Sequence, residues 1–325
     1  MTFSLRITGA LTGLGLTLMG GVAHAESWDM PTPYPDASLT TGVIRDFATE
    51  VKGLTKGAID ITIHSNGSLV KHPEIKRAVQ TGQAQMGEIL ISILANDDPV
   101  FGVDAVPFLA SSYDAAQKLD ALSRPAIDKR FEKARLKVLF TIPWPPQGLY
   151  TKKEVNSLSD LKGIKFRTYN PSTSRIAELA GMIPTKIEVA ELAQAFGTGV
   201  VDAMLTSSAT GVDTKSWEFV SDFYDVQAWL PRSAVVINKE VFEALPADQQ
   251  KALLAAAAEA QKKGWALSRQ RNDEFLKTLA SNGIKLHKPS DKLKAELDQI
   301  GQTMTAEWIK AAGADGQAIV DTFRK

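Results

Sequence analysis

Hydrophobic and polar positions follow two different periods along this chain, one typical of strands and one of helices. Ile59–Ile63 puts every second side chain on the same face, as a strand does. Within Leu39–Thr55, the apolar residues Val43, Phe47 and Val51 recur at the spacing of one helix face. The first part of the chain therefore predicts a helix followed by a strand.

Strands and helices continue to alternate along the rest of the chain. Further strands are predicted at Trp28–Met30, Met86–Leu94, Leu136–Ile142, Ile164–Tyr169, Lys186–Val189, Ala203–Leu205 and Val226–Asn238. Further helices are predicted at Pro73–Thr81, Pro171–Ala180, Ala190–Gly197 and from Asp248 to about Ala280. The segment 86–94 also fits a strand that turns into a helix. This alternation predicts an α/β architecture with helices on both faces of each sheet.

The length of the chain and of its longest helix predicts two lobes. The helix predicted from Asp248 to about Ala280, roughly 33 residues, would measure about 50 Å, which is enough to span two lobes. About 300 residues follow the N-terminal segment, more than one ordinary core holds. Since no flexible linker is evident, the chain is expected to cross between lobes more than once. We predict lobe I from residues 26–145 and 233–272, and lobe II from residues 146–232 and 273–325.

The first 25 residues have the composition of a secretory signal. A single charge, Arg6, precedes an apolar run from Ile7 to Val22, and Ala23-His24-Ala25 is a small-x-small cleavage site. The run is short and rich in Gly and Thr, which favours a cleaved signal over the alternative of a membrane anchor. We therefore expect an exported protein, cleaved after Ala25.

The cysteine content of the chain excludes disulfides, and its net charge argues against a nucleic-acid-binding protein. The chain has no cysteine and therefore no disulfide. Loss of Arg6 with the signal leaves 36 of the 37 Lys and Arg against 37 Asp and Glu, a net charge of about −1. A protein that binds nucleic acid is expected to carry a basic excess, so we expect no nucleic-acid partner.

Motifs for catalysis and for metal binding are missing. His64, His72 and His287 stand far apart, without an HExxH pair or cysteine, so no zinc site is expected. There is no G-x-S-x-G motif, and the glycines of 197–199 follow a helix and lack the third glycine of a dinucleotide loop. We expect a binding protein without a cofactor; a secreted enzyme of unfamiliar type is the alternative.

Candidate binding residues follow strands, where ligands lie in the crevice between α/β lobes. The strand 164–169 places Arg167 and Tyr169 on one face and stops at Asn170-Pro171, a helix start. A guanidinium and a phenol beside a helix N-terminus suit the capture of a carboxylate. The other candidates in such loops are Tyr34, Glu88, Trp144, Gln147, Thr206, Ser207 and Ser208.

Several of these candidates have a second interpretation. Arg167 also fits a surface arginine after a turn. Trp144 and Tyr169 would supply a flat apolar wall for a ligand. Glu88 would accept a ligand hydroxyl, or would be a helix-terminal charge or a buried hinge partner. Tyr34, in a proline-rich turn, contacts ligand or only packs.

Five segments together resemble the extracytoplasmic solute-binding subunits of tripartite ATP-independent periplasmic (TRAP) transporters, the DctP-like family. They are Phe47–Val51 with Thr55–Gly57, Ala78–Gly82, Val106–Leu109, Asp160–Arg167 and Gly199–Ala203. The resemblance covers essentially the whole mature chain. It implies a two-lobed periplasmic-binding-protein (venus-flytrap) fold, a periplasmic location, no enzymatic activity, and the small and large TRAP membrane subunits as partners.

The resemblance also implies roles for particular residues. Family members bind organic acids, and an arginine at the position of Arg167 holds the ligand carboxylate. Gln147 stands where many members have a second basic residue, and Thr206 where asparagine is common. We expect a monomer that binds a monocarboxylate with a hydroxy, keto or aromatic substituent. A binding component of an ABC importer or of a sensor system is the alternative.

Overall fold

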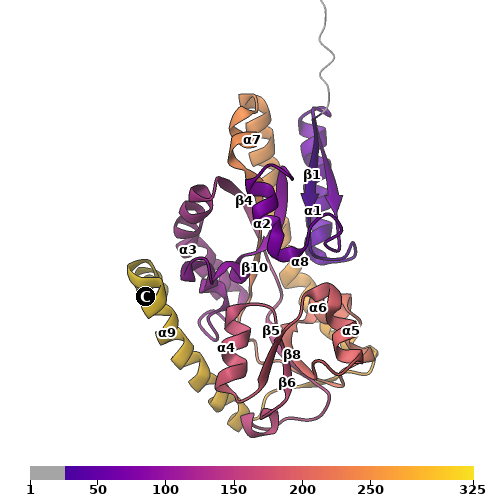
Figure 1. Ribbon diagram of the computed structural model, residues 1–325, viewed down its shortest axis with the longest axis vertical. Coiled ribbons are helices and arrows are strands. Elements are labelled where there is room, and N and C mark those ends of the chain that lie inside the picture. Colours follow the sequence, from indigo (N-terminus) through magenta and orange to yellow (C-terminus); the bar gives the residue numbers. More distant parts are fainter. Residues whose placement is uncertain (1–25) are drawn as a thin grey trace, which may run out of the picture.

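The computed structural model describes residues 26–325, so the predicted signal peptide lies outside the described residues. The described chain forms two lobes, each built around its own β-sheet (Figure 1). In Figure 1 the upper lobe contains β4 and β10, and the lower lobe contains β5, β6 and β8. This arrangement is the predicted two-lobed α/β fold.

The first lobe combines a three-stranded sheet with a two-stranded parallel pair. The larger sheet has the order β3-β10-β4, and β10 is antiparallel to both neighbours. The strands are β1 (Glu26–Pro31), β2 (Ile59–His64), β3 (Met86–Leu90), β4 (Leu136–Pro143) and β10 (Arg232–Asn238). The helices are α1 (Leu39–Leu54), α2 (Ile75–Gln80), α3 (Tyr113–Lys133) and α7 (Lys239–Ala244).

The second lobe is built on a six-stranded mixed sheet with the order β11-β9-β5-β8-β6-β7. The strands are β5 (Gln147–Thr151), β6 (Lys165–Thr168), β7 (Ile183–Lys186), β8 (Ala203–Ser207), β9 (Asp222–Tyr224) and β11 (Lys285–His287). The helices are α4 (Pro171–Leu179), α5 (Leu192–Gly197) and α6 (Ser208–Asp213). Strand β6 is parallel to both β7 and β8, whereas β5 is antiparallel to β8 and β9.

Two long helices contact both lobes. Helix α8 (Ala247–Ser281) has 35 residues and is therefore about 52 Å long. It packs on α1 and β4 in the first lobe and on α6 and β11 in the second, as predicted from its length. Helix α9 (Asp291–Phe323) contacts α3 and α4 and kinks at Gly313, where φ is +63°.

The periodic apolar positions of α1 form part of the core. Val43, Phe47 and Val51 are almost fully buried, and the Phe47 ring lies 4.9 Å from that of Phe140 in β4. Burial of each such side chain contributes about 1.5–3 kcal/mol. The apolar face predicted from the helical spacing in the sequence is therefore the face that α1 packs against the sheet.

Two predicted strands are wrong in extent. Of the segment 226–238, only Arg232–Asn238 is a strand; residues before it cross between the lobes, where the Ala228 N–H donates to the Gln147 carbonyl at 3.0 Å. The strand predicted at 186–189 lies at Ile183–Lys186, where it pairs with β6 in parallel from Lys165↔Ile183 to Thr168↔Lys186. Extended backbone at a lobe crossing and edge-strand register are both tertiary features.

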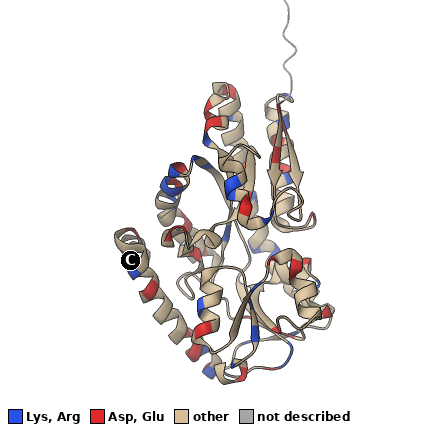
Figure 2. Cartoon of the chain, viewed as in Figure 1, with Lys and Arg blue, Asp and Glu red and all other residues tan. Residues whose placement is uncertain are grey.

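Charges of both signs are interspersed over both lobes (Figure 2). This distribution agrees with the balanced composition of the chain. Across residues 26–325, none of the helices combines the length and apolar character needed to cross a bilayer.

Candidate functional site

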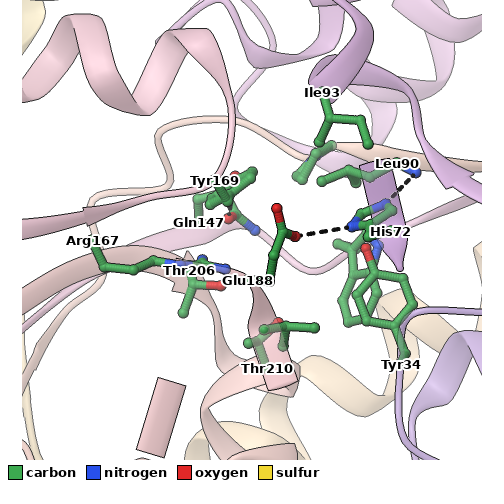
Figure 3. A pocket seen from close by; sticks show the side chains of 13 residues that line it. Tyr34, His72, Leu90, Ile93, Gln147, Arg167, Tyr169, Glu188, Thr206 and Thr210 are labelled. Carbon is green, nitrogen blue, oxygen red and sulfur yellow. Dashed lines mark hydrogen bonds and ion pairs between the residues drawn. The ribbon is translucent and has the colours of Figure 1, made fainter. Parts of the chain in front are cut away.

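A pocket lies between the lobes, at the ends of strands from both sheets (Figure 3). It holds about 430 Å³ of space between protein atoms, part of it open to solvent. The first lobe contributes Tyr34, His72, Leu90, Ile93 and Trp144, and Pro231 comes from the segment that crosses between the lobes. The second lobe contributes Gln147, Arg167, Tyr169, Glu188, Val189, Thr206 and Thr210. A mixed apolar and polar pocket of this size suits a small metabolite.

Arg167 is a buried cation without an acidic partner. It lies in β6 and is only 4% exposed, and its Nε donates to the Ile187 carbonyl at 3.0 Å. Within residues 26–325, no carboxylate oxygen lies within 4.0 Å of its guanidinium, and burial lowers its pKa to about 10. The guanidinium therefore keeps donors for an anion that the protein itself does not supply.

Tyr169 and Gln147 form the wall beside this arginine. Tyr169 directly follows β6, and extended backbone keeps residues two apart on one face, so the Arg167 guanidinium carbon lies 4.7 Å from the centre of the Tyr169 ring. The Tyr169 hydroxyl donates to Gln147 Oε1 at 2.9 Å, and Gln147 Nε2 donates to the Pro145 carbonyl at 3.1 Å. These bonds leave one Gln147 N–H for another acceptor.

An aromatic pair covers the opposite side of the pocket. The rings of Tyr34 and Trp144 lie 4.5 Å apart, and Trp144 Nε1 donates to Ser233 Oγ at 3.1 Å. Since the indole N–H is already bonded, Trp144 offers mainly its apolar surface. A ligand in the pocket would therefore have a cation on one side and aromatic surface on the other.

A polar contact joins the lobes across the pocket. His72 Nδ1, from the first lobe, lies 3.6 Å from Glu188 Oε2 in the second, and the Leu90 N–H donates to His72 Nε2 at 3.4 Å (Figure 3). Burial opposes ionisation of Glu188, but the His72 contact and the charges of Lys186 and Arg167 together lower its pKa. The pocket thus contains an ionised carboxylate as well as a cation.

Six of the ten predicted site residues line this pocket: Tyr34, Trp144, Gln147, Arg167, Tyr169 and Thr206. The other four lie outside its lining, and their polar atoms are used elsewhere in the structure: Glu88, Asn170, Ser207 and Ser208. Ser207 directly follows the lining residue Thr206 in β8, and one position along a strand reverses the face of a side chain.

Asn170 connects local and interlobe structure. As predicted, it caps α4, where its Oδ1 accepts from the Thr173 N–H at 2.8 Å and Pro171 is the first helical residue. Its Nδ2 donates across the lobes to Ser92 Oγ at 2.9 Å. The side chain therefore contacts the opposite lobe instead of the pocket.

The other three residues are structural as well. Glu88 is fully buried in β3, where its Oε2 accepts from Thr32 Oγ1 at 2.5 Å, and burial raises its pKa to about 7. Ser207 Oγ accepts from the Thr210 N–H at 3.0 Å, which caps α6. Ser208 Oγ donates to Asn272 Oδ1 in α8 at 2.8 Å.

Seven lining residues were not among the candidates predicted from the sequence, namely His72, Leu90, Ile93, Glu188, Val189, Thr210 and Pro231. His72 was considered only as a metal ligand. Glu188 fell within a segment predicted to be a strand, whereas it follows β7 and precedes the short 3-10 helix Val189–Glu191. A polar residue shortly after the end of a strand is the signal that could have identified Glu188. That signal requires the correct end of β7, which is Lys186.

One group outside the pocket has the residue types of a metal site. Ligand atoms of Glu154, Asp222 and His287 lie within 4.8 Å of one another. His287 Nε2 is 2.7 Å from Asp222 Oδ1, and Lys285 Nζ is 3.6 Å from Glu154 Oε1. These side chains already pair with each other or with a lysine, so the group is explained as a structural ion-pair cluster.

Comparison with known proteins gives one consistent result. The family model for bacterial extracellular solute-binding proteins of family 7, DctP, matches residues 32–311. The C4-dicarboxylate-binding periplasmic protein DctP of Rhodobacter capsulatus is 24% identical over 298 residues, which cover 88% of this chain and 87% of that protein.

Solved structures agree with the family match. DctP7 of Bordetella pertussis, an extracytoplasmic solute receptor binding pyroglutamic acid, is 48% identical with a TM-score of 0.91, covering 93% of this chain and 100% of its own. A TRAP solute-binding protein from a marine metagenome, specific for pyroglutamate, is 44% identical with a TM-score of 0.91. That comparison covers 92% of this chain and 99% of the other.

Proposed function

The chain belongs to family 7 of the bacterial extracellular solute-binding proteins, the DctP family, and on this premise we propose that it captures pyroglutamate or a closely similar monocarboxylate between its lobes. The family and the solved relatives are receptors that bind solutes for transport and are not enzymes. The two relatives that bind pyroglutamate are 48% and 44% identical to this chain. Pyroglutamate is a carboxylate on a five-membered lactam ring.

Arg167 is the residue that we propose holds the ligand carboxylate. Support comes from one observation above all: this guanidinium is buried in the interlobe pocket and lacks a carboxylate partner among residues 26–325. A bidentate arginine–carboxylate pair fixes orientation as well as charge. Thr206 and Thr210 line the same pocket and offer hydroxyl donors to the same group.

The rest of the pocket would supply the remaining affinity. A charged hydrogen bond contributes about 1.5–3 kcal/mol net, whereas micromolar binding needs about 8 kcal/mol. The rings of Tyr34 and Trp144, with the aliphatic side chains of Leu90 and Ile93, offer apolar contact to a small ring. The free N–H of Gln147 Nε2 would suit the lactam carbonyl.

Lobe closure is part of the proposal. The polar contacts His72–Glu188 and Ser92–Asn170 both join the lobes and define a closed form. We assign residues 26–145 and 233–272 to lobe I and the remainder of 26–325 to lobe II, as sheet membership supports, since β10 returns to the first sheet. The closed, ligand-bound monomer would then deliver its solute from the periplasm to TRAP membrane subunits.

Calorimetry with the chain lacking residues 1–25 tests this function. Pyroglutamate should bind with a Kd of about 1 µM or lower, corresponding to roughly 8 kcal/mol, and should raise the melting temperature by mass action. Succinate, a dicarboxylate, should bind far more weakly, because the pocket has Gln147 in place of a second cation. Absence of both heat and a thermal shift at millimolar pyroglutamate would reject the ligand, and a screen of other organic acids would replace it.

A further inference from the structure

Glu188 is an unexpected residue in a pocket that we propose for an anion. It lines the same pocket as Arg167, but no contact of 4.0 Å or less joins the two side chains. In Figure 3 its carboxylate points into the space between the labelled side chains of both lobes. A second carboxylate near the cation would repel an anionic ligand unless the ligand offers it a hydrogen-bond donor.

His72 faces this carboxylate from the other lobe. Because His72 Nε2 accepts the Leu90 N–H at 3.4 Å, its ring hydrogen lies on Nδ1, which faces Glu188 Oε2 at 3.6 Å. The other oxygen, Oε1, lies 3.5 Å from Lys186 Nζ, a cation that is 63% exposed. Both contacts are longer than a normal hydrogen bond, so the Glu188 oxygens retain capacity to accept from a ligand.

We propose that Glu188 selects ligands that carry a hydrogen-bond donor on the carbon that bears the carboxylate. This inference rests on the proposed function, since it takes Arg167 as the carboxylate partner. In pyroglutamate the lactam N–H is attached to that same carbon, so a carboxylate bound at Arg167 directs the N–H toward the neighbouring part of the pocket. Glu188 is the lining side chain there that only accepts hydrogen bonds.

Ligands that have only hydrogen-bond acceptors on the carbon next to the carboxylate should be excluded by Glu188. A 2-oxo acid or a lactone would place oxygen lone pairs against the Glu188 carboxylate. The carboxylate would then lose its water partners without gaining a donor, and unmet hydrogen bonds in a site built for a donor are a strong source of rejection. The keto acids among the ligands expected from the sequence would therefore bind poorly, whereas lactams and 2-hydroxy acids have the required donor.

A matched pair of ligands isolates this interaction. 5-Oxotetrahydrofuran-2-carboxylate has the shape and charge of pyroglutamate, with a ring oxygen in place of the N–H. Calorimetry should show that the native protein binds the lactam at least about tenfold more tightly than the lactone. In Glu188→Gln the amide can present either its oxygen or its N–H, so the preference should fall below about threefold. Glu243→Gln, on exposed α7, should keep the native preference.

Each result has a distinct meaning. Equal affinity of the native protein for lactam and lactone would overturn the role of Glu188 and leave pyroglutamate binding intact. An undiminished preference in a folded Glu188→Gln variant, checked by its melting curve, would also overturn it. Failure of the native protein to bind either ligand would reject the proposed function and this inference with it.

Discussion

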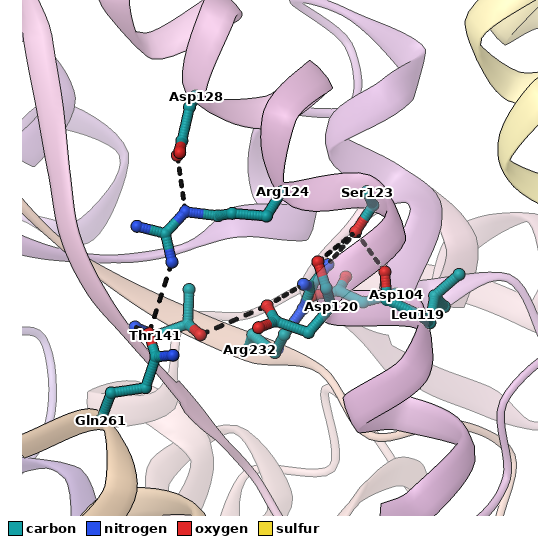
Figure 4. A network of polar contacts seen from close by, with 9 residues as sticks. All are labelled: Asp104, Leu119, Asp120, Ser123, Arg124, Asp128, Thr141, Arg232 and Gln261. Atoms are coloured by element: carbon teal, nitrogen blue, oxygen red, sulfur yellow. Dashed lines mark hydrogen bonds and ion pairs between the residues drawn. The ribbon is translucent and has the colours of Figure 1, made fainter. Parts of the chain in front are cut away.

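Arg167 and Arg232 are both almost fully buried but differ in their partners. Arg232 Nε donates to Asp104 Oδ2 at 3.1 Å, its Nη1 contacts Asp120, and its Nη2 donates to Ser123 Oγ at 3.3 Å (Figure 4). Within residues 26–325, no carboxylate oxygen lies within 4.0 Å of the Arg167 guanidinium; the carboxylate of its own pocket, Glu188, lies farther away. Arg232 therefore belongs to the folded core, whereas Arg167 keeps free donors in the pocket, where we propose that a ligand carboxylate binds.

Arg167→Met should separate stability from binding. Removal of a buried charge without an ionic partner should leave the ligand-free protein as stable as before, or more stable. The same change should weaken pyroglutamate binding by about 2–5 kcal/mol, if the carboxylate is buried at this position. Thermal unfolding without ligand and calorimetry with ligand measure the two effects. Arg45→Ala, an exposed arginine paired with Asp36, is the control, and normal binding by Arg167→Met would contradict the assignment.

Arg232→Met should have the opposite effect on stability. It leaves Asp104 and Asp120 buried without their cation, a loss expected to cost about 3–5 kcal/mol in the free energy of unfolding. Urea unfolding of the ligand-free variant measures this change. An unfolding midpoint equal to that of the native protein would show that the network contributes little.

Ser92→Ala tests closure without touching the pocket lining. Ser92 Oγ accepts from Asn170 Nδ2 across the lobes at 2.9 Å, and loss of this bond removes about 0.5–1.5 kcal/mol from the closed form. Ligand affinity should therefore fall by roughly twofold to twelvefold, although no ligand contact is lost. Solution scattering of the native protein should show a smaller radius of gyration at saturating ligand. An unchanged scattering curve would argue against closure.

Glu88→Gln should remove a pH dependence of stability. Burial raises the pKa of Glu88 from 4.5 to about 7, so the folded protein binds this proton more tightly than the unfolded chain. The corresponding stability is fully present below pH 4.5 and is lost as pH rises through 7. Between pH 4.5 and 8, the native protein should lose about 3 kcal/mol relative to Glu88→Gln, at 1.36 kcal/mol per pKa unit. If the free energy of unfolding changed by the same amount with pH in both proteins across this range, Glu88 would not be the source of the pH dependence.

Local signals explain which parts of the site could be predicted. The alternation in β6 placed Arg167 and Tyr169 on one face, and the Asn170-Pro171 pair marked the start of α4. Both features depend on residues adjacent in sequence. In contrast, Asn170 was expected at the ligand, but its amide reaches Ser92 in the other lobe. A local pattern shows the face on which a side chain lies and does not show what lies opposite.

The sequence by itself determined the alternation of strands and helices, the span of α8 and the family resemblance, because hydrophobic period, caps and helix length are local properties. Only the tertiary structure decided that His72 and Glu188, 116 positions apart, meet across the pocket. It also decided that Arg232 pairs with Asp104 and Asp120, whereas no carboxylate among residues 26–325 lies within 4.0 Å of Arg167. Pairing between residues far apart in the sequence depends on how their helices and strands pack in space, and burial then sets the cost of each unpaired charge.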